Sequence, residues 1–253
     1  MSAPRDWDAT TYERLSAPIA AMGREVLARL ELEGDETVLD AGCGTGKVTA
    51  ELVARLPRGH VIAVDGSQAM VEEARRRLPS SVDVRQADLL ELSLDRPVDA
   101  IVSTATFHWI SDHDRLFARL RDALAPGGRL VAQCGGEGNV AAVKRAGFEL
   151  SHRKPFAEHL ADWPGDWYFA SVADTEQRLR RLGFTDVWCW STRVEVGLDA
   201  GDVPGYLEAI CLGSFLERLP EDLRGAFVEQ AVELLGAPLT LHYVRLNILA
   251  RRG

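Results

Sequence analysis

The chain has 253 residues, of which 46% are hydrophobic, and 29 lysines and arginines against 38 aspartates and glutamates give it a formal net charge of −9. This length and composition suit one large globular domain and exclude a chain that is disordered throughout. The acidic charge argues against a protein whose main task is to hold nucleic-acid phosphates or an anionic membrane, so we expect neither partner.

Other features of the composition concern metals and location. The four cysteines are widely spaced and form no Cys-x-x-Cys pair, which predicts free thiols and no metal site. The N-terminal stretch contains acids and lacks the apolar segment of a signal peptide. No apolar run reaches the length of about 18 residues that a membrane-spanning helix requires. We therefore expect a cytoplasmic protein, as a monomer or a homodimer.

The first half of the chain alternates between two kinds of pattern. Short apolar runs predict strands at residues 37–40, 60–65, 82–86, 98–103 and 129–134. Helical spacing of apolar residues predicts helices at residues 47–56, 68–78 and 113–124. Strands that alternate with helices of this length are typical of a parallel sheet whose two faces are both covered by helices.

Two alternating runs near the end of the chain, 184–196 and 239–250, predict two further strands, with a helix at 174–182 before them. Trp188 and Trp190 share one face of the first run and are predicted to pack there. We therefore expect an α/β fold with a Rossmann-like, mostly parallel sheet of seven strands, an antiparallel last strand, and helices on both faces. Ligands of such open sheets bind beyond the carboxyl ends of the strands.

Two less regular segments interrupt the second half. Residues 135–172 are rich in Gly, Trp and His and show no clean period, whereas residues 203–235 predict two helices that are split near Leu219. We expect both segments to be substrate-side insertions that form a helical lid. Together with the sheet they would make a single domain over residues 1–253.

A glycine-rich turn, in the sequence VLDAGCGTG, follows the first predicted strand. Gly42, Gly44 and Gly46 alternate, which lets the backbone turn sharply and approach a ligand closely. The helix that follows offers free backbone N–H groups. The spacing departs from the dinucleotide fingerprint, because Lys47 stands where that pattern has glycine or alanine. It also departs from the phosphate-loop pattern, where Val48 would be serine or threonine.

Two aspartates stand at the ends of the next two predicted strands. Asp65 ends the second strand, and a carboxylate there can accept hydrogen bonds from both ribose hydroxyls of a nucleotide. Asp88 follows the third strand and could accept a hydrogen bond from an adenine amino group. Either residue alone could be a solvated loop acid or a helix cap. Their register with the glycine turn favours a nucleoside site.

These motifs resemble those of class I S-adenosylmethionine-dependent methyltransferases. The matching pieces are VLDAGCGTG, VIAVDGSQAM, QADLLEL, VDAIVSTATFHWI and LRDALAPGGRLV. The resemblance implies S-adenosylmethionine as cofactor and methyl transfer as the reaction. It also implies a sheet of seven strands whose last strand is antiparallel, in agreement with the pattern of the residues.

The resemblance also implies which residues hold the methyl donor. They are Tyr12, Asp40, Gly42, Cys43, Gly44, Gly46, Asp65, Gly66, Met70, Asp88, Leu89 and Ser103. Asp40 and the glycine turn would hold the methionine part of the donor. Asp65 would take the ribose hydroxyls, and Asp88 with the backbone of Leu89 would take the adenine. Residues 1–34 would form a helical cap over the donor.

A narrower resemblance concerns the methyl acceptor. The segments DWDATTYERLSAP, TFHWI and HYVRLNILARR are similar to trans-aconitate methyltransferases and their relatives, which esterify small carboxylic acids. In that pattern Tyr12 would reach over the donor. The wider methyltransferase resemblance implies that Met70 packs near the adenine of the donor and that Ser103 lies beneath its sulfonium. The implied acceptor-side residues are His108, Trp109, Tyr243 and Arg245.

His108 is the candidate catalytic side chain. A carboxylate acceptor is already ionised at neutral pH and needs no base, whereas a phenol or an alcohol would benefit from one. Basic residues that could clamp a tricarboxylate do not form an evident group in the sequence. Arg153, Lys154 and Arg193 are candidates beside Arg245.

Two other classes of protein compete with a small-molecule methyltransferase. A nicotinamide-dependent oxidoreductase would use a related fold, but Lys47 and the predicted strand order argue against it. A non-catalytic module that binds the adenosyl cofactor would share every donor-side motif. We therefore predict methyl transfer to a small molecule, most simply O-methylation of a carboxylate.

Overall fold

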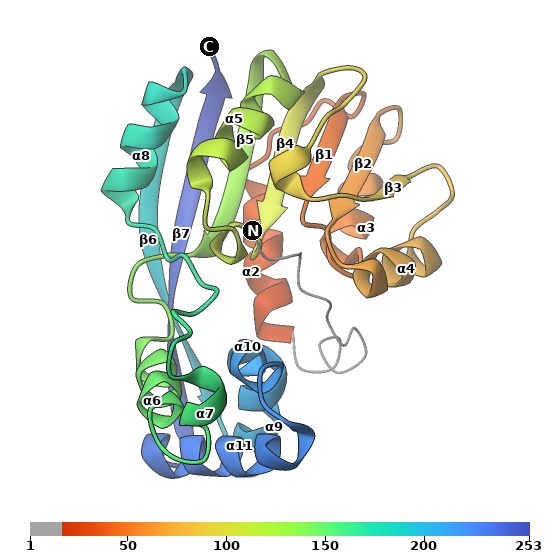
Figure 1. The fold of residues 1–253 in the computed structure, drawn as a ribbon. Coiled ribbons are helices and arrows are strands. Elements are labelled where there is room, and N and C mark those ends of the chain that lie inside the picture. The colour runs from red at the N-terminus through yellow and green to blue at the C-terminus, as the bar shows by residue number, and fades with distance from the viewer. Residues whose placement is uncertain (1–16) are drawn as a thin grey trace.

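The computed structural model describes residues 17–253, with side chains from residue 23 onward, and its centre is one seven-stranded sheet (Figure 1). The strands are β1 (Thr37–Ala41), β2 (His60–Asp65), β3 (Asp83–Gln86), β4 (Val98–Thr104), β5 (Leu124–Gly135), β6 (Phe184–Leu198) and β7 (Leu239–Arg252). Their order is β3-β2-β1-β4-β5-β7-β6. Strands β1 to β5 pair in parallel, and β7 runs antiparallel to both of its neighbours. The predicted sheet with its antiparallel last strand is confirmed.

Helices cover both faces of this sheet. The longer ones are α2 (Ala17–Ala28), α3 (Lys47–Ala54), α4 (Gln68–Arg77), α5 (His113–Ala123) and α8 (Val172–Arg181). Successive residues of a strand point to opposite faces, so in β1 Val38 packs with α2 and α3, whereas Leu39 packs on the side of α5 and α8. The central strands β1, β2 and β4 therefore read as nearly continuous apolar runs, because both of their faces are covered.

A second group of helices packs below the carboxyl edge of the sheet. It contains α6 (Ala141–Ser151), α7 (Ala157–Leu160), α9 (Val203–Tyr206), the π-helical turn η3 (Leu207–Cys211), α10 (Gly213–Leu216) and α11 (Glu221–Leu235). Strands β6 and β7 are long enough to leave the sheet body and reach this group (Figure 1). We call this group, with the far ends of β6 and β7, the helical lobe.

The helical lobe has its own hydrophobic core, separate from the two cores that cover the sheet. Phe215 lies fully buried at its centre, with the rings of Trp163 and Phe227 at centroid distances of 4.9 and 5.4 Å. Helix α6 lies within 135–172, the segment without a clean period, and it starts at Val140 with φ 41° and no capping side chain. The usual start signal of a helix is therefore missing from the sequence.

The outer surface corrects one prediction. Trp188 and Trp190 do share a face of β6, where their rings stack 4.5 Å apart, but Trp188 is 60% exposed and does not pack into a core. The guanidinium of Arg29, just after α2, lies over the ring of Trp190.

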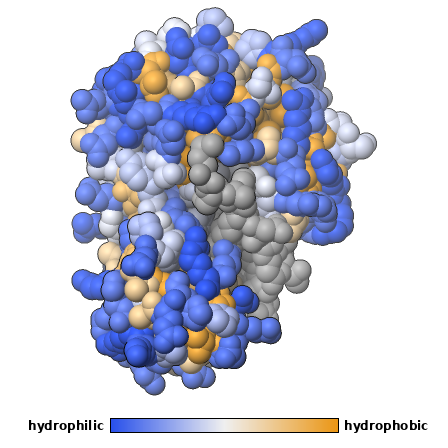
Figure 2. All heavy atoms as spheres, in the orientation of Figure 1, coloured by the Kyte–Doolittle hydropathy of each residue, from blue (hydrophilic) through white to orange (hydrophobic). Residues whose placement is uncertain are grey.

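The face of the molecule that Figure 2 shows is mostly hydrophilic, with hydrophobic residues in small groups. Within residues 17–253, no helix has the length and apolarity needed to cross a membrane.

Candidate active site

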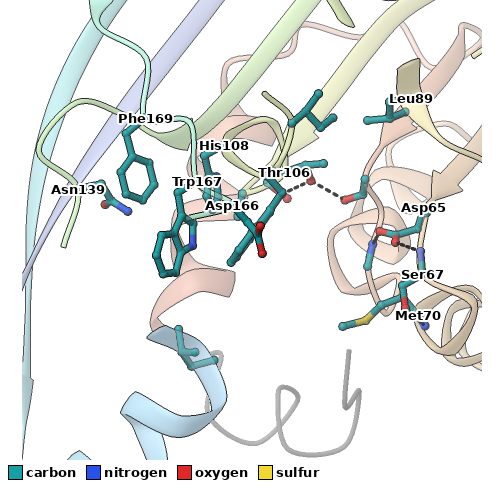
Figure 3. A pocket seen from close by; sticks show the side chains of 18 of the residues that line it. Asp65, Ser67, Met70, Leu89, Thr106, His108, Asn139, Asp166, Trp167 and Phe169 are labelled. Carbon is teal, nitrogen blue, oxygen red and sulfur yellow. Dashed lines mark hydrogen bonds between the residues drawn. The ribbon is translucent and has the colours of Figure 1, made fainter. Parts of the chain in front are cut away.

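A cavity of about 440 Å³ lies between the carboxyl edge of the sheet and the helical lobe. One end, which we call the donor end, is lined by the turn after β1 and by residues at the ends of β2 and β3. The other, the acceptor end, is lined by the short 3-10 helix η2 (Phe107–Trp109), by residues 139–169 and 210–218, and by β7. Figure 3 shows Asp65, Met70 and Leu89 across the cavity from His108 and Trp167. A single cavity thus joins two differently built ends.

The glycine turn forms part of the donor end and is held by backbone hydrogen bonds. The N–H groups of Gly42 and Cys43 both donate to the carbonyl of Val64, at 2.8 and 3.0 Å. Gly42 has φ 86°, and a Cβ there would overlap the side chain of Thr106. Gly44 also has a positive φ, of 53°, but no heavy atom lies within 4 Å of the position of its missing Cβ. Because Gly44 lines the cavity, a ligand could approach the backbone closely in this open space, which we call the cradle.

Asp65 is fixed beside this turn by two backbone groups. Its carboxylate accepts hydrogen bonds from the N–H of Gly44, at 2.8 Å, and from the N–H of Ser67, at 2.9 Å (Figure 3). Burial raises the pKa of Asp65 above its ordinary value, and these hydrogen bonds oppose that rise. Each carboxylate oxygen can accept more than one hydrogen bond, so Asp65 can also serve a ligand.

The remaining donor-end residues come from the loops after β2 and β3. Asp88 accepts a hydrogen bond from the N–H of Leu90, at 2.9 Å, and thereby caps the short 3-10 helix η1 (Leu89–Glu91). Gly66, Met70 and Leu89 line the same end. The residues of these loops that the sequence predicts to hold the methyl donor therefore lie together at one end of the cavity.

Three predicted donor residues, Asp40, Gly46 and Ser103, lie behind the turn and do not line the cavity. The Ser103 hydroxyl is buried and donates to the carbonyl of Ala41 at 2.6 Å. Gly46, with φ 79°, is the residue before α3. Tyr12 lies outside the described residues.

Asp40 is a fully buried carboxylic acid. Its Oδ2 accepts a hydrogen bond from the Thr49 hydroxyl at 2.7 Å, while Oδ1 has no hydrogen-bond partner among the residues that the structure describes. Burial raises the pKa of Asp40 to about 7, and the nearby charge of Asp65 adds to the effect. Asp40 therefore titrates near neutral pH, and a cationic group that reached Oδ1 would stabilise its charged form.

At the acceptor end, His108 follows β4 and is held by the backbone of β5. The N–H of Gly135 donates to Nδ1 of His108 at 3.2 Å. Burial, with smaller effects of Arg245 and His113, holds the pKa of His108 well below its ordinary value. A neutral ring that accepts at Nδ1 carries its proton on Nε2, where it is a hydrogen-bond donor. This tautomer argues against the role of general base that the sequence left open.

Strand β7 supplies the two other predicted acceptor residues. Arg245 is buried, and its Nε donates to Oε1 of Gln133 at 3.3 Å. The hydroxyl of Tyr243 lies 2.8 Å from that of Tyr206. Arg245, Tyr243, His108 and Trp109 all line the cavity, as the sequence-based grouping required. Of the other basic candidates, Arg153 pairs with Glu149 on the surface and Arg193 lines a different cavity.

Several lining residues were not predicted from the sequence. They include Asn139, Lys144, Asp166 and Arg218. Arg218 donates to both carboxylate oxygens of Asp166, each at 3.2 Å, and its guanidinium lies 4.3 Å from the ring centroid of Trp163. This ion pair joins two residues that are 52 positions apart in the chain. No pattern in either segment of the sequence indicates their contact.

The donor end fits an adenosyl ligand. The open cradle at Gly44, the fixed carboxylate of Asp65 and the volume of about 440 Å³ suit a nucleoside-sized molecule. Residues 38–128 match the family described as "Methyltransferase domain". Sequence match, strand order and cavity together define an S-adenosylmethionine-dependent methyltransferase.

Comparison with whole proteins identifies a family within this class of methyltransferases. The trans-aconitate 2-methyltransferase of Azoarcus sp. is 33% identical over 236 residues, which cover 88% of this chain and 86% of that protein. That of Methylobacterium nodulans is 32% identical, and the match covers 98% of each chain. This chain therefore belongs to the trans-aconitate methyltransferase family. Nothing in these comparisons points to a nicotinamide-dependent oxidoreductase.

A solved structure shows the same fold at lower identity. The phosphoethanolamine N-methyltransferase 2 of Haemonchus contortus, in complex with S-adenosyl-L-methionine, superposes with a TM-score of 0.63 at 17% identity. The match covers 97% of this chain and 57% of that longer one. At such identity the likeness concerns the fold alone, and it agrees with the sheet described above.

Proposed function

We propose that this enzyme transfers the methyl group of S-adenosylmethionine to a carboxylate oxygen of a small-molecule acid. The observation that carries the proposal is that Arg245 and His108 line one cavity, and that Nδ1 of His108 already accepts a hydrogen bond from the N–H of Gly135. This pair offers a positive charge and a hydrogen-bond donor, and it offers no basic group. Such a site suits an acceptor that is already anionic at neutral pH. The names of the relatives support the same chemistry.

The donor-end residues would each bind one part of the cofactor. We assign the ribose hydroxyls to Asp65, the adenine to Asp88, Leu89 and Met70, and the methionine part to the glycine turn. Gly66 and Cys43 would complete the wall of this end. When bound, the cofactor supplies an electrophilic methyl group on a positively charged sulfur.

Three further residues do not line the cavity but would stabilise the donor end. Asp40, Gly46 and Ser103 hold the shape of the turn, because their contacts are with the protein. Asp40 could also receive the cationic amino group of the cofactor at its unpartnered oxygen if the turn adjusted. Tyr12 remains an expectation from the resemblance.

The chain's own contribution to the reaction is positioning and the exclusion of water. Arg245 and the Nε2–H of His108 would hold the acceptor carboxylate toward the donor end. The rings of Trp109, Trp167 and Phe169 would keep water from this part of the cavity. No proton has to be removed from the acceptor, so His108 can stay neutral during the reaction.

The wider setting of the enzyme is also a proposal. We propose a single domain over residues 1–253, in which residues 1–34 cap the donor and the segments 135–172 and 203–235 enclose the acceptor. The enzyme would work in the cytoplasm, as a monomer or a homodimer. A net charge of −9 supports an acceptor other than nucleic acid.

The substitution His108→Asn tests the proposal, because asparagine keeps an acceptor for the N–H of Gly135 and cannot act as a base. We expect the KM for the acid to rise about tenfold with turnover changed only a few-fold. The kcat/KM of the native enzyme should show no histidine titration between about pH 5 and 8. His60→Asn, at an exposed position on β2, is the control. A loss of turnover with unchanged KM would indicate general-base chemistry and overturn the proposal.

A further inference from the structure

Asn139 stands in a turn that backbone hydrogen bonds hold at the acceptor end. The turn follows β5, and the N–H of Asn139 donates to the carbonyl of Gly136 at 2.9 Å. The N–H groups of Gly136 and Val140 donate to carbonyls of β7, at 2.9 and 3.1 Å. Val140 has φ 41°, a conformation that a β-branched residue rarely adopts and that the surrounding structure must enforce. The backbone of Asn139 is therefore fixed from both sides.

The amide group of Asn139 is held in one orientation. Its Oδ1 accepts a hydrogen bond from the backbone N–H of Val244 at 3.0 Å. A backbone N–H can only donate, so its partner is the amide oxygen, and the NH2 group is left to serve another partner. Asn139 is 5% exposed, and its Nδ2 has no hydrogen-bond partner among the residues that the structure describes. A buried donor without a partner is disfavoured, so Nδ2 requires one in the cavity that Asn139 lines.

The side chains of Asn139 and His108 meet around one glycine. The N–H of Gly135 donates to Nδ1 of His108 at 3.2 Å, and a Cβ built on Gly135 would lie 2.8 Å from Nδ2 of Asn139 and 2.8 Å from the ring of Phe169. The ring centroids of His108 and Phe169 are 5.7 Å apart. Figure 3 shows Asn139 and Phe169 on the same side of the cavity as His108. Two groups that donate hydrogen bonds, the amide of Asn139 and the ring of His108, are thus neighbours at the acceptor end.

We infer that Asn139 binds the methyl acceptor, with its NH2 group donating a hydrogen bond to an oxygen of the carboxylate that His108 also holds. The inference rests on the proposed function, because it takes the acceptor to be a carboxylate. Both side chains donate, so this part of the site favours oxygens with lone pairs and disfavours an ammonium group, whose N–H groups would face other N–H groups. Asn139 is therefore a residue that determines specificity.

Two variants of Asn139 separate this role from a purely structural one. Asn139→Asp keeps an oxygen for the N–H of Val244 and replaces the NH2 group by a second oxygen, which repels a carboxylate. Asn139→Ala removes both groups. If Asn139 binds the acceptor, the KM for the acid should rise about tenfold in Asn139→Ala and about a hundredfold in Asn139→Asp. If Asn139 only supports the backbone of Val244, the order reverses, because only the alanine variant loses that hydrogen bond.

The measurement uses the purified full chain and three probes, trans-aconitate, succinate and benzoate, which are a tricarboxylic, a dicarboxylic and a monocarboxylic acid. Methyl ester formation is followed by mass spectrometry, and the variants are compared on the acid with the highest kcat/KM in the native enzyme. KM does not depend on the fraction of enzyme that is folded, so a partial loss of folding leaves the comparison valid. Gln177→Glu, at an exposed position on α8, makes the same change of charge and should leave KM unchanged.

The outcomes separate the inference from the proposed function. A KM in Asn139→Asp that is no higher than in Asn139→Ala would overturn the inference and leave carboxylate methylation intact. Methylation of a phenol by the native enzyme, with no ester formed from any of the three acids, would overturn the proposed function and the inference with it.

Discussion

The two ends of the cavity are built in different ways. The donor end is formed by three consecutive strand-and-loop units between residues 37 and 90, and backbone hydrogen bonds fix its shape. The acceptor end is assembled from η2, from two segments of the helical lobe and from β7, which are far apart in the chain. The first end is a product of local turn geometry, and the second depends on how distant elements dock. Mutations should therefore affect the two ends differently.

The largest effect is expected from Gly42→Ala. The new Cβ would overlap Thr106 in a backbone conformation with φ 86°, so both packing and backbone strain oppose it. We expect the free energy of unfolding to fall by about 3 kcal/mol or more and donor binding to be lost. Urea denaturation and calorimetric titration with S-adenosylhomocysteine measure the two effects.

Gly44→Ala is the matched control for this prediction. Its Cβ would meet no protein atom, so the stability should fall only by the cost of the positive φ, about 1 kcal/mol. Donor affinity should still fall strongly, because the methyl group fills the cradle. Normal donor binding in Gly44→Ala would show that the cradle does not hold the ligand.

The next largest effect is expected on the pH dependence of stability, through the buried carboxyl group of Asp40. Its pKa of about 7 in the folded state lies above the ordinary value, so the folded protein binds more protons than the unfolded chain between about pH 4 and 7. The stability due to this group is present below pH 4 and is lost as the pH rises through 7. Across this window the loss is on the order of a few kcal/mol.

Asp40→Asn tests this assignment, since asparagine stays neutral and can still accept the hydrogen bond from Thr49. We expect the decline of the melting temperature between about pH 5 and 8 to become shallower in the variant. Asp95→Asn, at an exposed position, should keep the native slope. Parallel curves for native enzyme and Asp40→Asn would contradict a raised pKa at this site.

The smallest effect is expected at the acceptor end, from Arg218→Met. The side chains of Arg218 and Asp166 are 33% and 29% exposed, so water screens their attraction and the stability should fall by only about 0.5 to 1 kcal/mol. The KM for the acid should rise a few-fold, because Asp166 loses the group that positions it. Arg153→Met, which breaks a more exposed pair with Glu149, is the control. A stability loss as large as that of Gly42→Ala would remove the contrast between the two ends.

Much of the donor end was predictable because short segments specify it. The glycine turn, Asp65 and Asp88 each stand at the end of a recognisable strand, and parallel strands bring such ends to one edge. The sequence could not show that Ser103 turns toward the carbonyl of Ala41, because that contact depends on the packing of β1 against β4. The sequence could not predict the exposure of Trp188 either, because a period of two identifies the residues that share a face of a strand and does not show what covers that face.

By itself the amino-acid sequence determined the strand and helix alternation, the sheet with its antiparallel last strand, and the glycine turn to which we assign the methyl donor. These follow from local periodicity and from backbone conformations that only certain residues adopt. Tertiary structure alone decided that Asp166 meets Arg218 and that Gly135 selects the tautomer of His108. Each of these contacts joins residues distant in the chain, whose approach depends on the docking of whole elements.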